Sequence, residues 1–162
     1  MGNSKKGGRK GMGRQVLTRA MLLPLTAQEV RAISLPAHLA LVALQRGQGE
    51  RDHTVELVQV LCRTNLMVAQ SGADVELPAL RVAVMVLKGV MENGRARGPG
   101  CAVSEHEAEA IAQLLTIHNR LLETLPRRWY DGAQRQIMRE VRREVMAVPG
   151  CMPLPGSSGA PV

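Results

Sequence analysis

The segment from Ser104 to Leu125 carries the pattern that most constrains how this chain folds. Ser104 and Glu107 have the spacing of a capping box, a pair of side chains that binds free N–H groups at the start of a helix. Apolar residues then recur at steps of three and four, the period of one helix face. This face consists of Ile111, Leu114, Leu115, His118, Leu121, Leu122 and Leu125. The segment predicts an amphipathic helix that packs on one side.

Two further helices are predicted near the N-terminus. Thr26 and Glu29 repeat the capping box and predict a short helix to about Ile33. The Ser34-Leu35-Pro36 sequence is expected to end it, because the residue before a proline is disfavoured in the α conformation. Pro36 suits the first turn of the next helix, which we expect to reach about Arg46, where glycines follow.

Two more helices are predicted over residues 52–70 and 127–148. Pro126 ends the helix that begins after Ser104 and starts the last one, so the connection between them is short. Helices joined by so short a connection are commonly antiparallel neighbours, and we expect a hairpin here.

Residues 77–92 are apolar around most of a helical circumference, with a narrow polar stripe at Arg81, Lys88 and Glu92. A helix of this kind is predicted to lie in the centre of a bundle. Its β-branched run is also compatible with a strand. Gly94–Gly100 (GRARGPG) is expected to be a basic loop that carries Arg95 and Arg97.

The two ends of the chain differ from the middle in composition. Residues 1–20 contain five glycines and six basic residues without an acidic one, and predict a flexible basic arm. Residues 149–162 are rich in Pro, Gly and Ser and predict a disordered tail. Aromatic residues make up only 1% of the chain, so Leu, Val, Ile, Ala and Met must form the core. The predicted fold is an all-α bundle of five to six helices over residues 21–148.

No pattern in the sequence predicts catalysis. The three cysteines are far apart, the His/Glu pairs form no metal-ligand set, and no glycine-rich loop has a phosphate-binding context. We therefore expect no enzyme activity, no metal and no cofactor. No apolar run is long enough for a secretory signal or a membrane span, which predicts a cytoplasmic location with reduced thiols.

The net charge of +7 is concentrated in two places. The arm holds +6, residues 21–126 hold −2, and residues 127–148 hold +3. Within the last helix, four arginines fall on one side, opposite Ala133, Ile137, Val141 and Val145. Clustered arginines favour contact with phosphates, although a solvated face gives the same pattern. The candidate nucleic-acid-binding residues are Lys5, Lys6, Arg9, Lys10, Arg14, Arg19, Arg95, Arg97, Arg128, Arg135, Arg139 and Arg142.

Sequence-specific DNA reading is not expected, because no pair of segments has the pattern of a helix-turn-helix. Base stacking on a single strand is not expected either, since Trp129 and Tyr130 are the only aromatic residues. Both are predicted to anchor the last helix on the bundle.

Three stretches resemble small helical proteins of proteobacterial phages and plasmids, some of them labelled Fis-like regulators. They are LPAHLALVALQRGQG (Leu35–Gly49), LVQVLCRTNLMVAQSG (Leu57–Gly72) and the residues from GRARGPG (Gly94–Gly100) to HNRLLE (His118–Glu123). The resemblance implies an accessory protein of a mobile element and supplies no functional residue.

Two function classes remain open from the sequence. The first is a small protein that binds nucleic acid through backbone charge with little sequence specificity. The second is a protein–protein interaction module, such as a regulator, an inhibitor or a structural component of a phage or plasmid system. Its support is the near-neutral middle of the chain and the nine methionines, since methionine-rich surfaces adapt to partners. Neither reading involves a membrane, and the sequence leaves the oligomeric state undefined.

Overall fold

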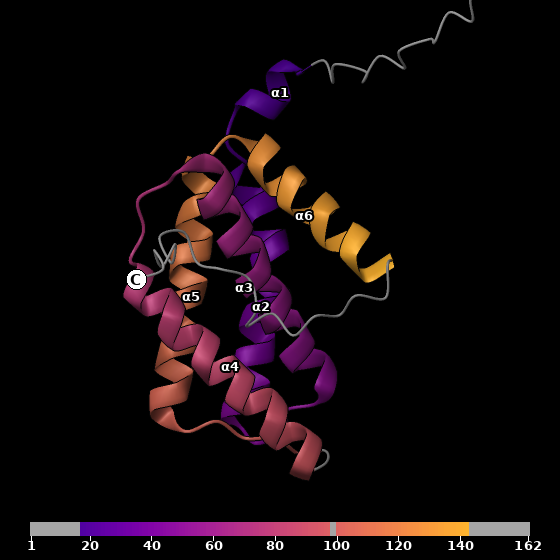
Figure 1. Cartoon of the computed structure of the whole chain (residues 1–162), viewed down its shortest axis with the longest axis vertical. Helices are drawn as coiled ribbons and strands as arrows, with labels where there is room; N and C mark the ends of the chain where they lie inside the picture. Colours follow the sequence, from indigo (N-terminus) through magenta and orange to yellow (C-terminus); the bar gives the residue numbers. More distant parts are fainter. Residues whose placement is uncertain (1–16, 98–99, 143–162) are drawn as a thin grey trace, which may run out of the picture.

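The computed structural model describes residues 17–97 and 100–142, with only the backbone of residues 94–97 and 141–142. This part of the chain forms a bundle of six helices and no strand, which confirms the predicted all-α class (Figure 1). The helices are α1 (Arg19–Leu22), α2 (Ala27–Gln45), α3 (Arg51–Ser71), α4 (Leu77–Arg97), α5 (Glu105–Thr124) and α6 (Arg127–Arg142). The tail 149–162 and most of the arm lie outside the described residues.

Local capping signals place the starts of α2 and α5 as predicted. The Glu29 N–H donates to Thr26 Oγ1 at 3.3 Å, and the Thr26 N–H donates to Glu29 Oε2 at 2.9 Å. Ser104 and Glu107 repeat this reciprocal pair at the start of α5. Each box satisfies donors that have no partner within the helix, and thereby defines its first turn.

Pro36 does not break α2, and the predicted boundary at Ser34-Leu35-Pro36 is wrong. A proline inside a helix leaves the carbonyl four residues earlier, here that of Ala32, without its N–H donor. Both Pro36 and Ala32 are exposed, so water can bind that carbonyl. Ser34 is buried in the same turn and donates a hydrogen bond to Asn119 Oδ1 of α5 at 2.6 Å. Tertiary contacts therefore outweigh the local preference.

The centre of the bundle is α3, so the prediction that residues 77–92 lie there is wrong. The central helix packs against α2, α4, α5 and α6, whereas α4 packs against α3 and α5. The segment is a helix, which excludes the strand reading, but its outer face leaves Val82 43% and Met85 74% exposed. It also continues beyond Asn93-Gly94, so Arg95 and Arg97 belong to the last turns of α4 and not to a loop.

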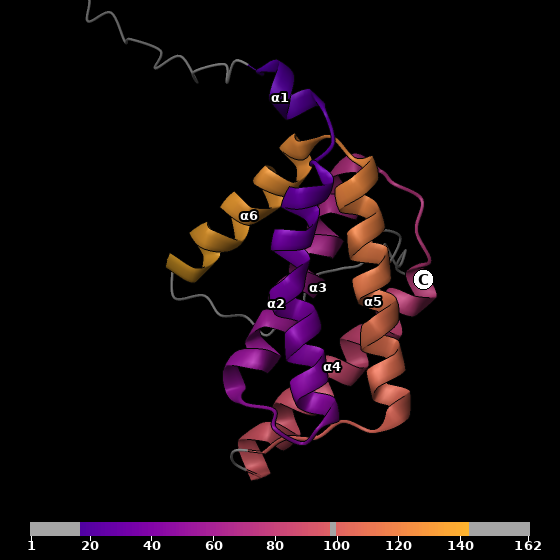
Figure 2. The same cartoon turned by 180° about the vertical axis from the view of Figure 1, so that it is seen from behind.

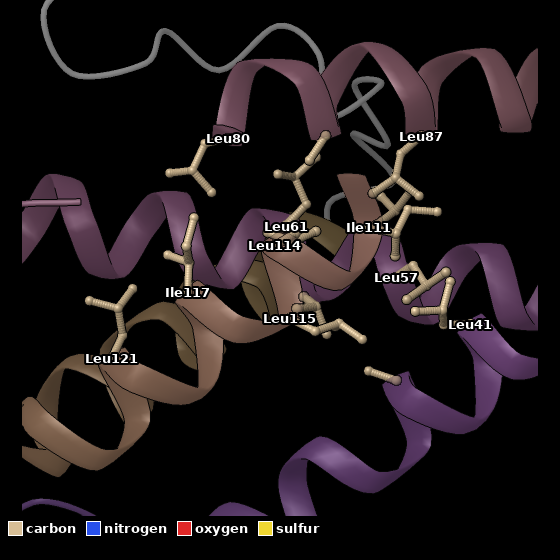
Figure 3. Packing of buried hydrophobic residues seen from close by; sticks show 14 of the residues in the cluster. Leu41, Leu57, Leu61, Leu80, Leu87, Ile111, Leu114, Leu115, Ile117 and Leu121 are labelled. Atoms are coloured by element: carbon tan, nitrogen blue, oxygen red, sulfur yellow. The ribbon is translucent and has the colours of Figure 1, made fainter. Parts of the chain in front are cut away.

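The core forms where α2, α3, α4 and α5 meet (Figure 3). Leu61 and Leu57 of α3, Leu80 and Leu87 of α4, and Ile111, Leu114 and Leu115 of α5 are at most 2% exposed. Leucine and isoleucine supply this core without a phenylalanine in the chain. Of the apolar face predicted from Ile111 to Leu125, the residues up to Leu122 are buried on α5, whereas Leu125 follows the helix and is half-buried.

The predicted hairpin between α5 and α6 is wrong, because α6 packs against α3 and touches α1. In both views α5 and α6 lie on opposite sides of α2 and α3 (Figures 1 and 2). Leu125 is extended and Pro126 follows, so the chain turns away from α5 at this point. The apolar face of α5 already contacts α2, α3 and α4, and Tyr130, Ala133 and Ile137 of α6 pack against the core from the side of α3.

Candidate nucleic-acid interface

The outward face of α6 carries the exposed part of the predicted arginine stripe. Ala133 is fully buried and Ile137 is 9% exposed, which confirms these two residues of the predicted inner side. The other two, Val141 and Val145, lie outside the part of the chain whose side chains are described. Arg135 and Arg139 are exposed on the other side. They are four residues apart, so their side chains are neighbours on the helix surface. No carboxylate of the described residues lies within 4.0 Å of either guanidinium.

Arg127 has a structural role that sets it apart from these two arginines. Its Nη1 donates to Glu29 Oε1 at 2.6 Å, and its Nε lies 3.5 Å from Asp131 Oδ2. Its backbone N–H donates to the Leu23 carbonyl at 2.8 Å. Hydrogen bonds from Thr26, together with the charge of Arg127, lower the pKa of the Glu29 carboxyl group. Arg127 therefore fastens the start of α6 to the segment between α1 and α2.

The first helix brings the N-terminal part of the chain to α6. Arg19 begins α1, and α1 touches α6. In both views α1 lies above the first turns of α6 (Figures 1 and 2). The basic residues Lys5, Lys6, Arg9, Lys10 and Arg14 precede this point in the sequence and lie outside the described residues.

The structure does not bring Arg95 and Arg97 to this surface. They lie in the last turns of α4, and that end of α4 is at the opposite end of the molecule's longest axis from α1 (Figure 1). These two candidates therefore do not share a surface with α1 and the start of α6. Arg142 is the last residue of α6, and its side chain lies outside the described part of the chain.

Arg128 differs from the other arginines of the stripe. It is half-buried, and its guanidinium carbon lies 4.8 Å above the centre of the Trp129 ring. Neighbouring residues of a helix do not normally face each other, so the sequence gives no signal for this contact. Tyr130 packs against the core as predicted, whereas Trp129 is half-buried and lies outside the core cluster.

His53 has a structural role, and Cys62 is kept in its protonated form. His53 accepts a hydrogen bond from the Glu50 N–H at 3.0 Å and thereby caps α3, while His106 is exposed. Burial and the nearby Glu140 raise the pKa of the Cys62 thiol to about 11, so this thiol stays protonated at neutral pH. Over residues 17–97 and 100–142, no three His, Cys, Asp or Glu side chains are close enough to share a metal ion.

Comparison with known proteins yields no relative: no family model, no curated protein and no solved structure matches this chain. Among the helices of the described residues, none is both long enough and apolar enough to cross a bilayer.

Proposed function

We propose that this chain is a non-enzymatic protein that binds the sugar–phosphate backbone of nucleic acid through α6 and the basic residues before α1. The observation that carries the proposal is the exposed pair Arg135 and Arg139, which has no carboxylate within ion-pair distance among the described residues. An arginine without a carboxylate partner can bind a phosphate without first breaking an ion pair.

The position of α1 supports the same proposal. Because α1 touches α6 near its start, the basic residues before Leu17 are joined to a helix that lies against α6. That part of the sequence has five basic residues and no acidic one. Binding one polyanion to both groups of charges releases more counterions than binding to either alone. We expect little sequence preference, because arginines that contact phosphates position a strand without reading its bases.

The test compares two double variants with the same change in charge. Arg135→Ala with Arg139→Ala removes two exposed positive charges from α6. Arg81→Ala with Lys88→Ala removes two from the exposed face of α4. We expect the α6 variant to weaken binding to DNA and RNA of any sequence, and the α4 variant to retain most of it. Equal losses in the two variants would mean that only the net charge matters and would contradict a binding face on α6.

A second candidate function, the interaction module, is supported by the outer face of α2. Leu35, Leu39 and Val42 follow the heptad steps of four and three and are 58%, 59% and 39% exposed. An apolar stripe of this spacing suits a helix of a partner protein. A photo-crosslinking residue at position 39 should then give one defined protein adduct in cells, while the same residue at exposed Gln113 of α5 should not.

We also propose that the protein is located in the cytoplasm and serves as an accessory protein of a phage or plasmid. The second part is implied by the sequence resemblance. Either function is compatible with them. A protein that holds nucleic acid by charge needs a compartment that contains nucleic acid, and this requirement agrees with the predicted location.

A further inference from the structure

We propose that Trp129 and Arg128 form a stacking site for one unpaired base, so that the ligand of α6 is single-stranded nucleic acid. This inference rests on the proposed function, because the strand must first be held by its phosphates. It departs from the sequence-based expectation that both aromatic residues only anchor α6.

The two aromatic side chains have different surroundings. Tyr130 packs against the core cluster and is used in holding α6 to the bundle. Trp129 lies outside that cluster and is half-buried, with a guanidinium above its ring at 4.8 Å. An indole ring that carries a planar cation on one face is already arranged for a planar ligand on that face.

Arg128 is held on the ring by weak interactions. It forms no ion pair among the described residues, whereas the adjacent Arg127 contacts both Glu29 and Asp131. The Arg128 Nε is buried and has no hydrogen-bond partner among the described residues. Stacking of a base on an aromatic ring is as strong as a partly desolvated cation–π contact or stronger. A base can therefore replace the guanidinium on the indole, and the released Arg128 can donate its N–H groups to the adjoining phosphate.

Arg128 connects the stacking site with Arg135 and Arg139, the two arginines proposed to bind phosphates. Arg128 and Arg135 are seven residues apart, nearly two helical turns, and therefore lie on the same side of α6 about 10.5 Å apart along its axis. Trp129 lies about 100° around the helix from Arg128, so a strand with one base on its ring reaches Arg135 and Arg139 by way of the Arg128 side of the helix. The bases of a duplex are paired and stacked inside the helix, so only a single strand, a loop or an end offers an unpaired base.

Trp129 is the only tryptophan in the chain, so its fluorescence reports on this site alone. The full-length protein is titrated with three ligands of equal length: a single-stranded DNA oligonucleotide, an abasic deoxyribose-phosphate strand and a DNA duplex. We expect the single strand to quench the indole emission, because a base then stacks on it. The abasic strand and the duplex should bind by charge and leave the emission nearly unchanged.

Variants separate stacking from charge. Trp129→Leu should lower the affinity for the single strand by about 5- to 150-fold, the range found for loss of one stacked base, and leave the affinity for the abasic strand unchanged. Trp129→Phe should recover part of the loss. Tyr130→Phe is the matched control and should bind the single strand as the wild-type protein does. Far-UV circular dichroism of each variant shows whether the bundle is intact.

The outcomes distinguish the two proposals. If the single strand binds without quenching, or Trp129→Leu affects the single strand and the abasic strand equally, the stacking site is wrong and charge-mediated binding stands. If none of the three ligands binds, both proposals are wrong.

Discussion

Thr64 of α3 and His118 of α5 form a hydrogen bond in the interior of the bundle, with 2.9 Å between Thr64 Oγ1 and His118 Nδ1. The Thr64 hydroxyl donates its only proton to the Val60 carbonyl at 2.8 Å, so the His118 Nδ1 must carry a proton and donate it to Thr64. Thr64 is fully buried and His118 is 1% exposed. The neutral imidazole thus links the central helix to α5, and its Nε2 has no partner among the described residues.

Replacing Thr64 with valine should destabilise the protein by about 1–3 kcal/mol, because the buried Nδ1–H of His118 then loses its acceptor. Urea denaturation measures this change. Thr116→Val is the control on α5: that threonine is exposed and bonds only to the Ala112 carbonyl, so its loss should change stability by less than about 0.5 kcal/mol. Equal effects of the two substitutions would contradict the role assigned to the buried pair.

The stability should fall as the pH is lowered below 6.5. Burial, and to a lesser degree the charge of Arg63, lowers the pKa of His118 from 6.5 to about 3. Between these two pH values the unfolded chain binds a proton at His118 that the folded protein does not. The contribution of neutral His118 to the free energy of unfolding is therefore fully present above pH 6.5 and decreases progressively toward pH 3. The loss should be about 2 kcal/mol between pH 7 and pH 5, where ordinary carboxyl groups remain ionised.

Denaturation curves at several pH values check this prediction in the wild type and two variants. His118→Gln should be less stable at pH 7 and should lose most of the dependence between pH 7 and pH 5. His106→Gln alters an exposed histidine of the same helix and should keep the wild-type dependence. A wild-type protein with constant stability over this range would rule out a buried neutral His118.

Pro36→Ala should stabilise the protein by about 1–3 kcal/mol, because it restores the hydrogen bond to the Ala32 carbonyl within an exposed helix interior. Pro78→Ala is the matched control. Pro78 is the second residue of α4, where the backbone N–H has no partner within the helix, so little change is expected. Thermal denaturation of the two variants gives the comparison, and a Pro36→Ala protein that melts below the wild type would contradict it.

Leu115→Ala should cost about 2–5 kcal/mol, as truncation of a buried leucine does. Leu115 is 2% exposed and lies on the face of α5 that is directed into the core. Met85→Ala removes a side chain of similar size that is 74% exposed and should cost far less. Similar melting temperatures for the two variants would place Leu115 outside the core.

The parts of the fold that follow from local chemistry could be predicted. The capping boxes at Thr26 and Ser104 involve residues three positions apart, so no knowledge of the rest of the fold is needed. Gly72, which ends α3 in the left-handed conformation at φ 68°, is a similar case.

The position of a helix in the bundle depends on which faces of the neighbouring helices are still free to pack. The sequence pattern of one helix does not determine this. The apolar residues 77–92 suggested a central helix, yet α3 holds that position with Arg63 and Thr64 buried. Their polar groups are satisfied by Glu56, Gln59, Val60 and His118, partners on the same helix and on α5. The same limitation affected the candidate site, where exposed Arg135 and Arg139 were predicted but the contact between Arg128 and Trp129 was not.

Deleting residues 1–16 should weaken binding to all nucleic acids and reduce its salt dependence. The deleted segment carries five basic residues and leaves α1, with its contact to α6, in place. Each neutralised phosphate contributes about 0.9 to the slope of log affinity against log salt concentration for a duplex and about 0.7 for a single strand. If about five phosphates are engaged by the wild-type protein, the slope should be about −4.5 on a duplex and about −3.5 on a single strand.

Salt titrations with two unrelated sequences, for the wild type and the deletion, measure both the slope and the sequence preference. Two unrelated sequences should give the same affinity, and the deletion should give a less negative slope with each. If the wild type does not bind at about 50 mM salt, where charge-mediated binding is strong, or if the deletion leaves the slope unchanged, the basic residues are only a solvated surface and the stripe on α2 becomes the better-supported functional face.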